Sequence, residues 1–164
     1  MDNVIRSHIE QIQIASRQNR LVVFVGAGVS ANSGVPTWRA LIDSFKKELP
    51  EQISEETDYL KIAQLYRELR GEKEYLDKVK NVLEYEKVSP NKIHKEILEL
   101  NPCHIVTTNY DDLIELSALA YNHQYYVVRE DKNLPANKGE KMIIKMHGDF
   151  NIGNIVLTEN DYFD

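Results

Sequence analysis

The segment at residues 21–38, LVVFVGAGVSANSGVPTW, constrains the fold more than any other part of the chain. Its first five residues, 21–25, are all apolar, which predicts a buried strand of a parallel sheet. The strand runs into the turn Gly26-Ala27-Gly28. Glycine-rich turns at the carboxyl ends of strands are where α/β proteins bind phosphate groups, because their backbone N–H groups can approach an anion closely.

The sequence of the turn excludes some types of nucleotide site, but it does not identify the ligand. Its pattern G-x-G-x-x-A, completed by Ala31, fits the dinucleotide fingerprint, although a tight turn that binds no nucleotide stays the alternative. A lysine-containing phosphate loop is excluded, because no lysine follows a suitably spaced glycine. The dehydrogenase arrangement needs a second strand ending in an acidic residue about 20 positions on. Residues 38–49 instead have the spacing of an amphipathic helix, so the sequence predicts a dinucleotide site of another kind.

Two more apolar segments, residues 103–107 and 142–146, are each followed by a cluster of polar residues. The carboxyl ends of parallel strands face the ligand crevice in open α/β sheets. We therefore expect Gly26, Asn109 and His147, which follow three different strands, to converge on one cleft. Strands that alternate with helices predict an α/β fold with a Rossmann-like parallel sheet and helices on both faces.

The apolar periodicity predicts the other elements of the chain. Helices are expected at residues 3–18, 58–70, 72–87, 89–100 and 110–121, further strands at 124–129 and 154–157, and a surface loop at 130–140. Ser89 and Pro90 are expected as N-cap and first residue of their helix. We expect a single domain, residues 1–164, with a helical insert at about 51–100. Its C-terminal part is expected to be missing, because the pattern predicts that another helix begins at Tyr162, where the sequence ends.

Composition excludes several classes of partner. The net charge of −6 argues against a general nucleic-acid surface, which needs clustered lysine and arginine. Cys103 is the single cysteine, so no intrachain disulfide and no cysteine zinc site can form, and no metal is expected. A reducing, cytoplasmic location fits this usage. The N-terminal segment lacks the apolar core of a signal peptide, and no apolar run reaches the ~20 residues of a membrane helix.

Four motifs together resemble the sirtuin family. They are GAGVS at residues 26–30, GVP with Trp38-Arg39 at 34–39, TTNYD at 107–111 and KMHG at 145–148, in the order of the family. The chain is most similar to the bacterial sirtuin-like domains of anti-phage defence proteins, such as Thoeris effectors. The TNYD and KMHGD forms of the motifs and the lack of a cysteine zinc module indicate that group.

The expected catalytic residues are Asn109 and His147. His147 is the candidate general base, because an ordinary imidazole pKa of about 6.5 suits proton transfer near neutral pH. The amide of Asn109 can hold a ribose hydroxyl or an attacking water. The alternatives are a purely structural histidine and an asparagine that caps the following helix.

The resemblance also implies a set of cofactor-binding residues. They are Gly26, Ala27, Gly28, Ser30, Arg39, Thr108 and Asp111. The first four are expected near the phosphates and the adjacent ribose. Arg39 is expected in a mobile segment that closes over the cofactor, with a surface cation as the alternative. Asp111 is expected near the nicotinamide carboxamide, with the first turn of a helix as the alternative. Thr37 departs from the family, since deacylating sirtuins usually have aspartate there.

The expected function is hydrolysis of NAD at the nicotinamide–ribose bond, giving nicotinamide and ADP-ribose, in an NAD-depleting anti-phage effector. A protein deacylase is one alternative, disfavoured by the missing zinc module. A non-catalytic module that binds NAD or ADP-ribose is another, disfavoured because a binder needs neither Asn109 nor His147. The expected partners are a further effector or regulatory domain or protein and a second copy of the chain, with no membrane and no direct nucleic acid.

Overall fold

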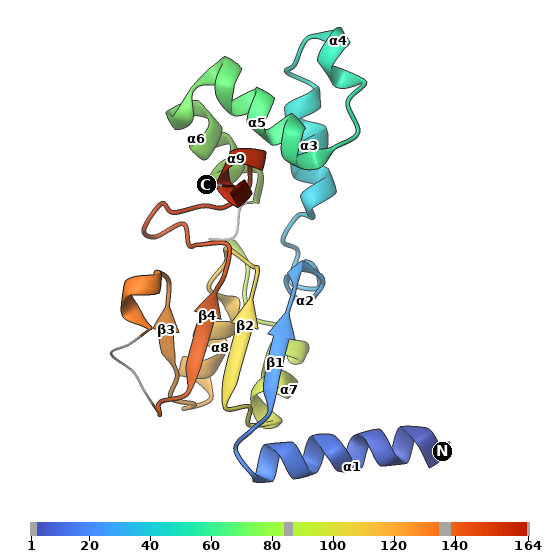
Figure 1. The fold of residues 1–164 in the computed structure, drawn as a ribbon, viewed down its shortest axis with the longest axis vertical. Coiled ribbons are helices and arrows are strands. Elements are labelled where there is room, and N and C mark those ends of the chain that lie inside the picture. The colour runs from blue at the N-terminus through green and yellow to red at the C-terminus, as the bar shows by residue number, and fades with distance from the viewer. Residues whose placement is uncertain (1–2, 84–86, 135–138, 164) are drawn as a thin grey trace.

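The fold is a parallel α/β sheet with a helical unit above the carboxyl ends of its strands (Figure 1). A computed structural model describes residues 3–83, 87–134 and 139–163. The strands are β1 (Val22–Val25), β2 (His104–Thr107), β3 (Tyr126–Val128) and β4 (Met142–Lys145). The helices are α1 (Asn3–Arg17), α2 (Ala27–Ala31), α3 (Trp38–Lys46), α4 (Glu51–Ser54), α5 (Tyr59–Arg70), α6 (Glu72–Leu83), α7 (Lys92–Glu99), α8 (Leu113–Ala120), the 3-10 helix η2 (Asp131–Asn133) and α9 (Glu159–Phe163).

Within the described ranges, the strands form one sheet in the order β1-β2-β4-β3, and all the pairs are parallel. This confirms the expected α/β class with a parallel sheet flanked by helices. Side chains at alternate positions share a face, and one face packs under α7 and α8. Its core is formed by Val25, Leu98, Ile105, Ile114, Ala118 and Ile143.

The opposite face of the sheet is open at β1. Phe24 is 64% exposed and Val22 is 51% exposed, and both point away from the α7–α8 side. The expectation that residues 21–25 are buried is therefore wrong for this face. The run of apolar residues predicted the strand correctly, but β1 lies at the edge of the described sheet, where only Val25 is buried.

The helical unit of α3, α5 and α6 has a core of its own. Phe45 and Tyr66 stack with ring centroids 4.3 Å apart, and Tyr75 lies next to them. Asp58 caps α5 through the backbone N–H of Leu60, at 2.9 Å. The remaining buried members of this core are Leu41, Ile42, Leu49, Ile62, Ala63, Val79, Leu83, Tyr110 and Leu157. The last two come from the sheet side of the molecule, so this core rests directly on the strand ends.

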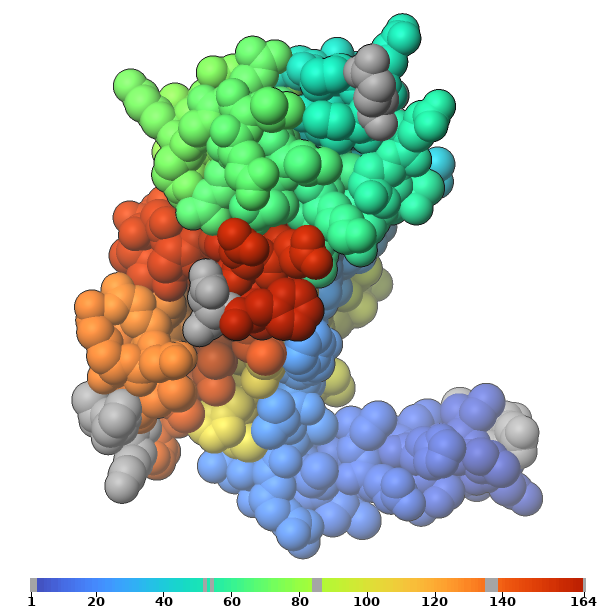
Figure 2. Space-filling view, turned by 45° about the horizontal axis from the view of Figure 1, so that its top comes forward, coloured from blue at the N-terminus to red at the C-terminus, as the bar shows by residue number. Residues whose placement is uncertain are grey.

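Helices α1 and α9 lie outside the sheet and the helical unit. Helix α1 projects from the foot of the sheet (Figures 1 and 2), and none of its described residues is buried. It touches the body where the Ser16 hydroxyl donates to the carbonyl of Leu100 at 2.7 Å. At the other end, α9 lies below the helical unit, where Arg67 of α5 pairs with Asp161 at 2.9 Å (Figure 2). Within the described ranges, no helix combines the length and apolar character needed to cross a bilayer.

Several expected boundaries are wrong. Residues 154–157 form no strand, because the N–H of Val156 donates to His147 O and the N–H of Leu157 donates to the carboxylate of Asp161. The helix expected at 89–100 begins instead at Lys92, after Asn91, whose side chain accepts from Ile93 N–H. The expected helices 38–49 and 110–121 and the expected strand 124–129 are shorter in the structure.

Some expectations fall partly outside the described residues. The helix expected at 72–87 is α6, which ends at Leu83, and residues 84–86 lie outside the described ranges. The loop expected at 130–140 contains η2, and residues 135–138 are also outside. The final helix, expected to begin at Tyr162, is α9, which begins at Glu159.

Candidate active site

Three strand ends meet above the sheet, as expected for Gly26, Asn109 and His147. β1 and β4 both flank β2, so the loops that follow these strands start side by side. The N–H of Thr108 donates to Val25 O at 3.3 Å, and the N–H of Met146 donates to Thr107 O at 2.8 Å. The parallel ladder therefore extends one step into the loops that carry the candidate residues.

A cavity of about 120 Å³ lies at this junction. Six of the expected site residues line it: Ala27, Ser30, Thr108, Asn109, Asp111 and His147. Its upper wall comes from the helical unit and the segment before it, including Pro36, Trp38 and Leu83. A wider hollow of about 920 Å³ lies beside α8 and β3 and contains none of the expected residues, so size alone does not locate the chemistry.

Asn109 is held rigidly and is 5% exposed. Its side-chain amide donates to the hydroxyl of Ser30 at 2.9 Å and to Gly26 O at 3.4 Å. Its backbone N–H donates to the hydroxyl of Thr107 at 3.0 Å. Because α8 begins at Leu113, Asn109 is not the cap of that helix, and that alternative is wrong. The amide instead joins the glycine turn to the end of β2.

His147 lies on the other side of the cavity. Its Nε2 is 3.1 Å from the hydroxyl of Tyr162, whose ring meets the imidazole edge-on with centroids 5.5 Å apart. Burial lowers the pKa of His147 below its ordinary value, because the charged imidazolium loses solvation. The imidazole is therefore neutral at pH 7 and able to accept a proton.

Two residues that line this cavity each have a buried side-chain atom with no hydrogen-bond partner among the described residues. These atoms are Oδ1 of Asn109 and Nδ1 of His147. Buried polar atoms are nearly always paired, so an unpaired one calls for a ligand, water or function. Here both belong to the two expected catalytic residues, and a hydroxyl-rich ribose or a water molecule could supply both partners.

The glycine turn is the start of a short helix. Gly26 is the N-cap of α2 and Gly28 lies inside it, so the expected turn at 26–28 is helical. A Cβ added at Gly26 or Gly28 would meet nothing within 4 Å, apart from the neighbouring residues and the helix's own backbone. This open space fits the close approach of a phosphate to the backbone.

Of two further expected binding residues, Asp111 lines the cavity and Arg39 does not. The side chain of Arg39 is 80% exposed, lies 4.0 Å from Asp43 and does not line the cavity, as in the alternative of a surface cation. Asp111 both lines the cavity and accepts the N–H of Leu113 at 3.2 Å. Its two proposed roles, near the ligand and at the start of α8, are therefore compatible in space.

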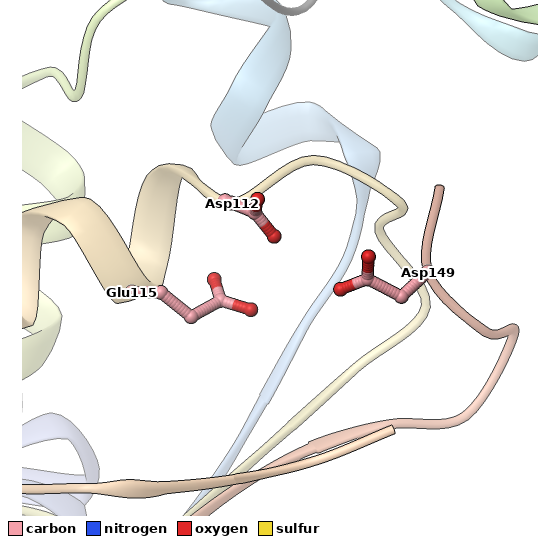
Figure 3. Close-up of side chains that lie close together, drawn as sticks. All are labelled: Asp112, Glu115 and Asp149. Atoms are coloured by element: carbon pink, nitrogen blue, oxygen red, sulfur yellow. The ribbon is translucent and has the colours of Figure 1, made fainter. Parts of the chain in front are cut away.

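A buried charged cluster next to the cavity was not expected. Figure 3 shows the carboxylates of Asp112, Glu115 and Asp149 pointing toward one another. The ammonium of Lys145 lies among them and is 2.8 Å from Asp149. A lysine at an inward position of the apolar run MIIK was the signal that could have revealed this cluster. Tyr162, next to His147, was also missed.

Comparisons with known proteins agree with this geometry. Residues 26–125 match the Sir2 family, and residues 103–164 match the SIR2-like domain. Over its full length the chain is 35% identical to Defense-associated sirtuin 2 of Bacillus subtilis, of which it spans 17%. Over 94% of its length it is 30% identical to NAD(+) hydrolase ThsA of Cytobacillus dafuensis, of which it spans 32%.

The chain is also similar to a protein that is named for a different activity. Over 64% of its length the chain is 29% identical to NAD-dependent protein deacylase of Pyrococcus abyssi, of which it spans 40%. The sheet, the motifs at its strand ends and these matches define the class of protein. The chain belongs to the Sir2 family.

Proposed function

We propose that this site hydrolyses NAD to nicotinamide and ADP-ribose. The observation that carries the proposal is the pair of unpartnered buried atoms, Asn109 Oδ1 and His147 Nδ1, at one cavity. The similarity to relatives named NAD(+) hydrolase ThsA supports the same reaction. The chain spans less than two thirds of those relatives, so the activity of the whole protein is part of the proposal.

The proposed reaction breaks the bond between nicotinamide and C1 of the ribose. Nicotinamide leaves as a neutral molecule, and the ribose gains the positive character of an oxocarbenium ion. The carboxylate of Asp111 at the cavity would stabilise that charge. A water held by Asn109 attacks C1 and passes a proton to neutral His147, which gives ADP-ribose.

Binding of the dinucleotide requires the cavity to open. Ligand pockets for small molecules usually enclose about 300–1,000 Å³, whereas this cavity measures about 120 Å³. We propose that the wall formed by Val35, Pro36 and Trp38 moves to admit NAD, and that Arg39 approaches the phosphates in that motion. The phosphates would lie on the open side of Gly26 and Gly28.

We also propose that residues 1–164 act as one NAD-binding domain of a larger defence effector, with an insert at about 51–100. A regulatory domain or partner and self-association would control it. The name Defense-associated sirtuin 2 supports the defence role. The similarity to the Pyrococcus abyssi deacylase makes deacylation the second candidate.

One assay separates the two candidates. The complete protein, in its activated state, is mixed with NAD, with and without an acetyl-lysine peptide, and nicotinamide, ADP-ribose and cyclic products are separated. We expect nicotinamide and ADP-ribose from NAD alone, at a rate that the peptide does not change. Nicotinamide release only in the presence of the peptide would establish the deacylase instead.

A further inference from the structure

Lys145, at the end of β4, is fully buried and surrounded by oxygen atoms. Its ammonium is 3.0 Å from Tyr110 O and 2.9 Å from Asp111 O, and it donates to both carbonyls. It also lies 3.0 Å from Asp112 Oδ1 and 2.8 Å from Asp149 Oδ2. An ammonium has three hydrogens to donate, so these contacts use all of its capacity.

The charges around Lys145 offset the cost of burying it. Removing an ammonium from water costs several kcal/mol unless opposite charges and hydrogen bonds compensate. Burial lowers the pKa of Lys145, but Glu115 at 3.3 Å, Asp149 and Asp112 outweigh this effect and the pKa ends above its ordinary value. Arg129 adds a second cation, 2.7 Å from Asp149.

This arrangement also explains the three carboxylates of Figure 3 without a metal ion. Their oxygens lie within 4.8 Å of one another, as ligands of a cation would. The ammonium of Lys145 already provides that cation, and it would repel a metal from the same place. Asp112 and Asp149 are therefore counter-ions of the lysine, whereas burial raises the pKa of Glu115 to about 7, so its carboxyl is only partly ionised at neutral pH.

The carbonyls that Lys145 holds belong to the active-site loop. Tyr110 and Asp111 follow Asn109 directly, and Lys145 precedes His147 by two residues. One side chain therefore connects the backbone beside Asn109 with the strand that carries His147. If the ammonium were removed, two buried carbonyls would lose a donor, and an unsatisfied buried carbonyl destabilises the position of its peptide group.

We propose that Lys145 is a positioning residue that sets the distance between Asn109 and His147 by holding the peptide groups at residues 110 and 111. The kinetic part of this inference rests on the proposed NAD hydrolysis. A misplacement of about 1 Å in an active site can reduce the rate by roughly 100-fold. Lys145 touches neither the cavity nor its unpaired atoms, so it acts through the loop.

The test compares Lys145→Met with Lys78→Met in the complete protein. Lys78 is paired with Glu48 in the helical unit, away from the site, so its loss is a matched control. We expect Lys145→Met to lower kcat roughly 100-fold, with a much smaller change in KM for NAD, and Lys78→Met to leave both unchanged. Backbone amide exchange should accelerate at residues 108–112 in the first variant alone.

A charge-balanced variant guards against simple unfolding. Lys145→Met combined with Asp112→Asn removes one positive and one negative charge and still leaves the two carbonyls without the ammonium. We expect it to fold and to keep the loss in kcat. Normal kcat in a folded variant, or failure of this double variant to fold, would overturn the positioning role. If the wild-type protein does not cleave NAD, the proposed function fails, while the exchange at 108–112 still decides whether Lys145 holds the loop.

Discussion

Two buried polar regions flank the loop at residues 110–112, and they differ in how their polar atoms are satisfied. On one side, the ammonium of Lys145 is surrounded by carbonyl and carboxylate oxygens. On the other side, Asn109 Oδ1 and His147 Nδ1 have no partner among the described residues. In the first region, which we call saturated, the ammonium of Lys145 has no hydrogen left to donate, although both carboxylate oxygens of Glu115 beside it lack a hydrogen-bond partner among the described residues. The unsaturated region has hydrogen-bonding capacity left for a ligand, which is what a binding site requires.

The residue between the two regions is Gly148, and its substitution should have the largest effect on stability. His147 faces the cavity, whereas Asp149 faces the charged cluster. Gly148 has φ +82°, and a Cβ there would lie 1.8 Å from Asn154 O. We expect Gly148→Ala to lower the free energy of unfolding in urea by roughly 2–5 kcal/mol, from left-handed strain plus overpacking.

Gly153→Ala is the matched control for Gly148→Ala. Gly153 has a similar φ of +72°, but a Cβ there would meet nothing within 4 Å. Its cost should be limited to the left-handed strain of about 1–2 kcal/mol. Equal costs for the two substitutions would mean that the tight packing between the two regions is not important for stability.

Gly28→Val tests the open side of the unsaturated region. The side chain would fill the space in which the phosphates are proposed to approach the backbone, and its Cβ would meet nothing within 4 Å beyond the neighbouring residues and the helix's own backbone. Losing backbone hydrogen bonds to a charged group costs about 1.5–3 kcal/mol. We therefore expect roughly 10- to 150-fold weaker NAD binding by calorimetry, with little change in thermal unfolding. Unchanged affinity would place the dinucleotide elsewhere.

The pH dependence of catalysis reports on the same region. Burial lowers the pKa of His147, so the neutral imidazole that accepts a proton persists below the ordinary value of about 6.5. The acidic limb of kcat/KM should therefore have its midpoint below pH 6.5, with activity lost as the pH falls through it. A midpoint above 6.5 would indicate that the imidazolium is stabilised in the site and would contradict the effect of burial on His147.

Tyr162→Phe should have the smallest effect. Its hydroxyl lies 3.1 Å from His147 Nε2 and orients the imidazole. A hydrogen bond of this kind contributes about 0.5–1.5 kcal/mol, so the rate of cleavage should fall only about 2- to 10-fold, with unchanged NAD affinity. A loss above 100-fold in single-turnover cleavage would show that Tyr162 takes part in the chemistry, and the division between the two regions would have to be redrawn.

The sequence predicted the saturated region less well than the unsaturated one. Apolar runs placed all the strands of the described sheet, and the polar residues after them placed Asn109 and His147 at one cavity. The lysine in the run MIIK was the one signal for the cluster of Lys145, but its partners could not be predicted, because two of them are backbone carbonyls 34 and 35 residues away. The side-chain hydrogen bond between Asn109 and Ser30 could not be predicted either, because 79 residues separate the two in the sequence.

The errors at residues 154–157 and 21–25 both arise from contacts with other parts of the chain. Residues 154–157 have an apolar run that predicts a strand, but their N–H groups bond to His147 O and to the carboxylate of Asp161 instead. At residues 21–25 the pattern predicted the strand but not its position at the edge of the described sheet. Burial depends on which elements cover a strand, and that information is not local.

The central claim is that Asn109 and His147 perform the cleavage with their unpaired atoms. The most direct test measures single-turnover NAD cleavage and NAD binding separately for wild type, Asn109→Ala and His147→Ala in the complete, activated protein. Loss of a positioned acid–base group costs about 100- to 10,000-fold, so both variants should stay folded, bind NAD and lose cleavage by that factor. Near-normal cleavage by a well-folded His147→Ala protein would contradict the account.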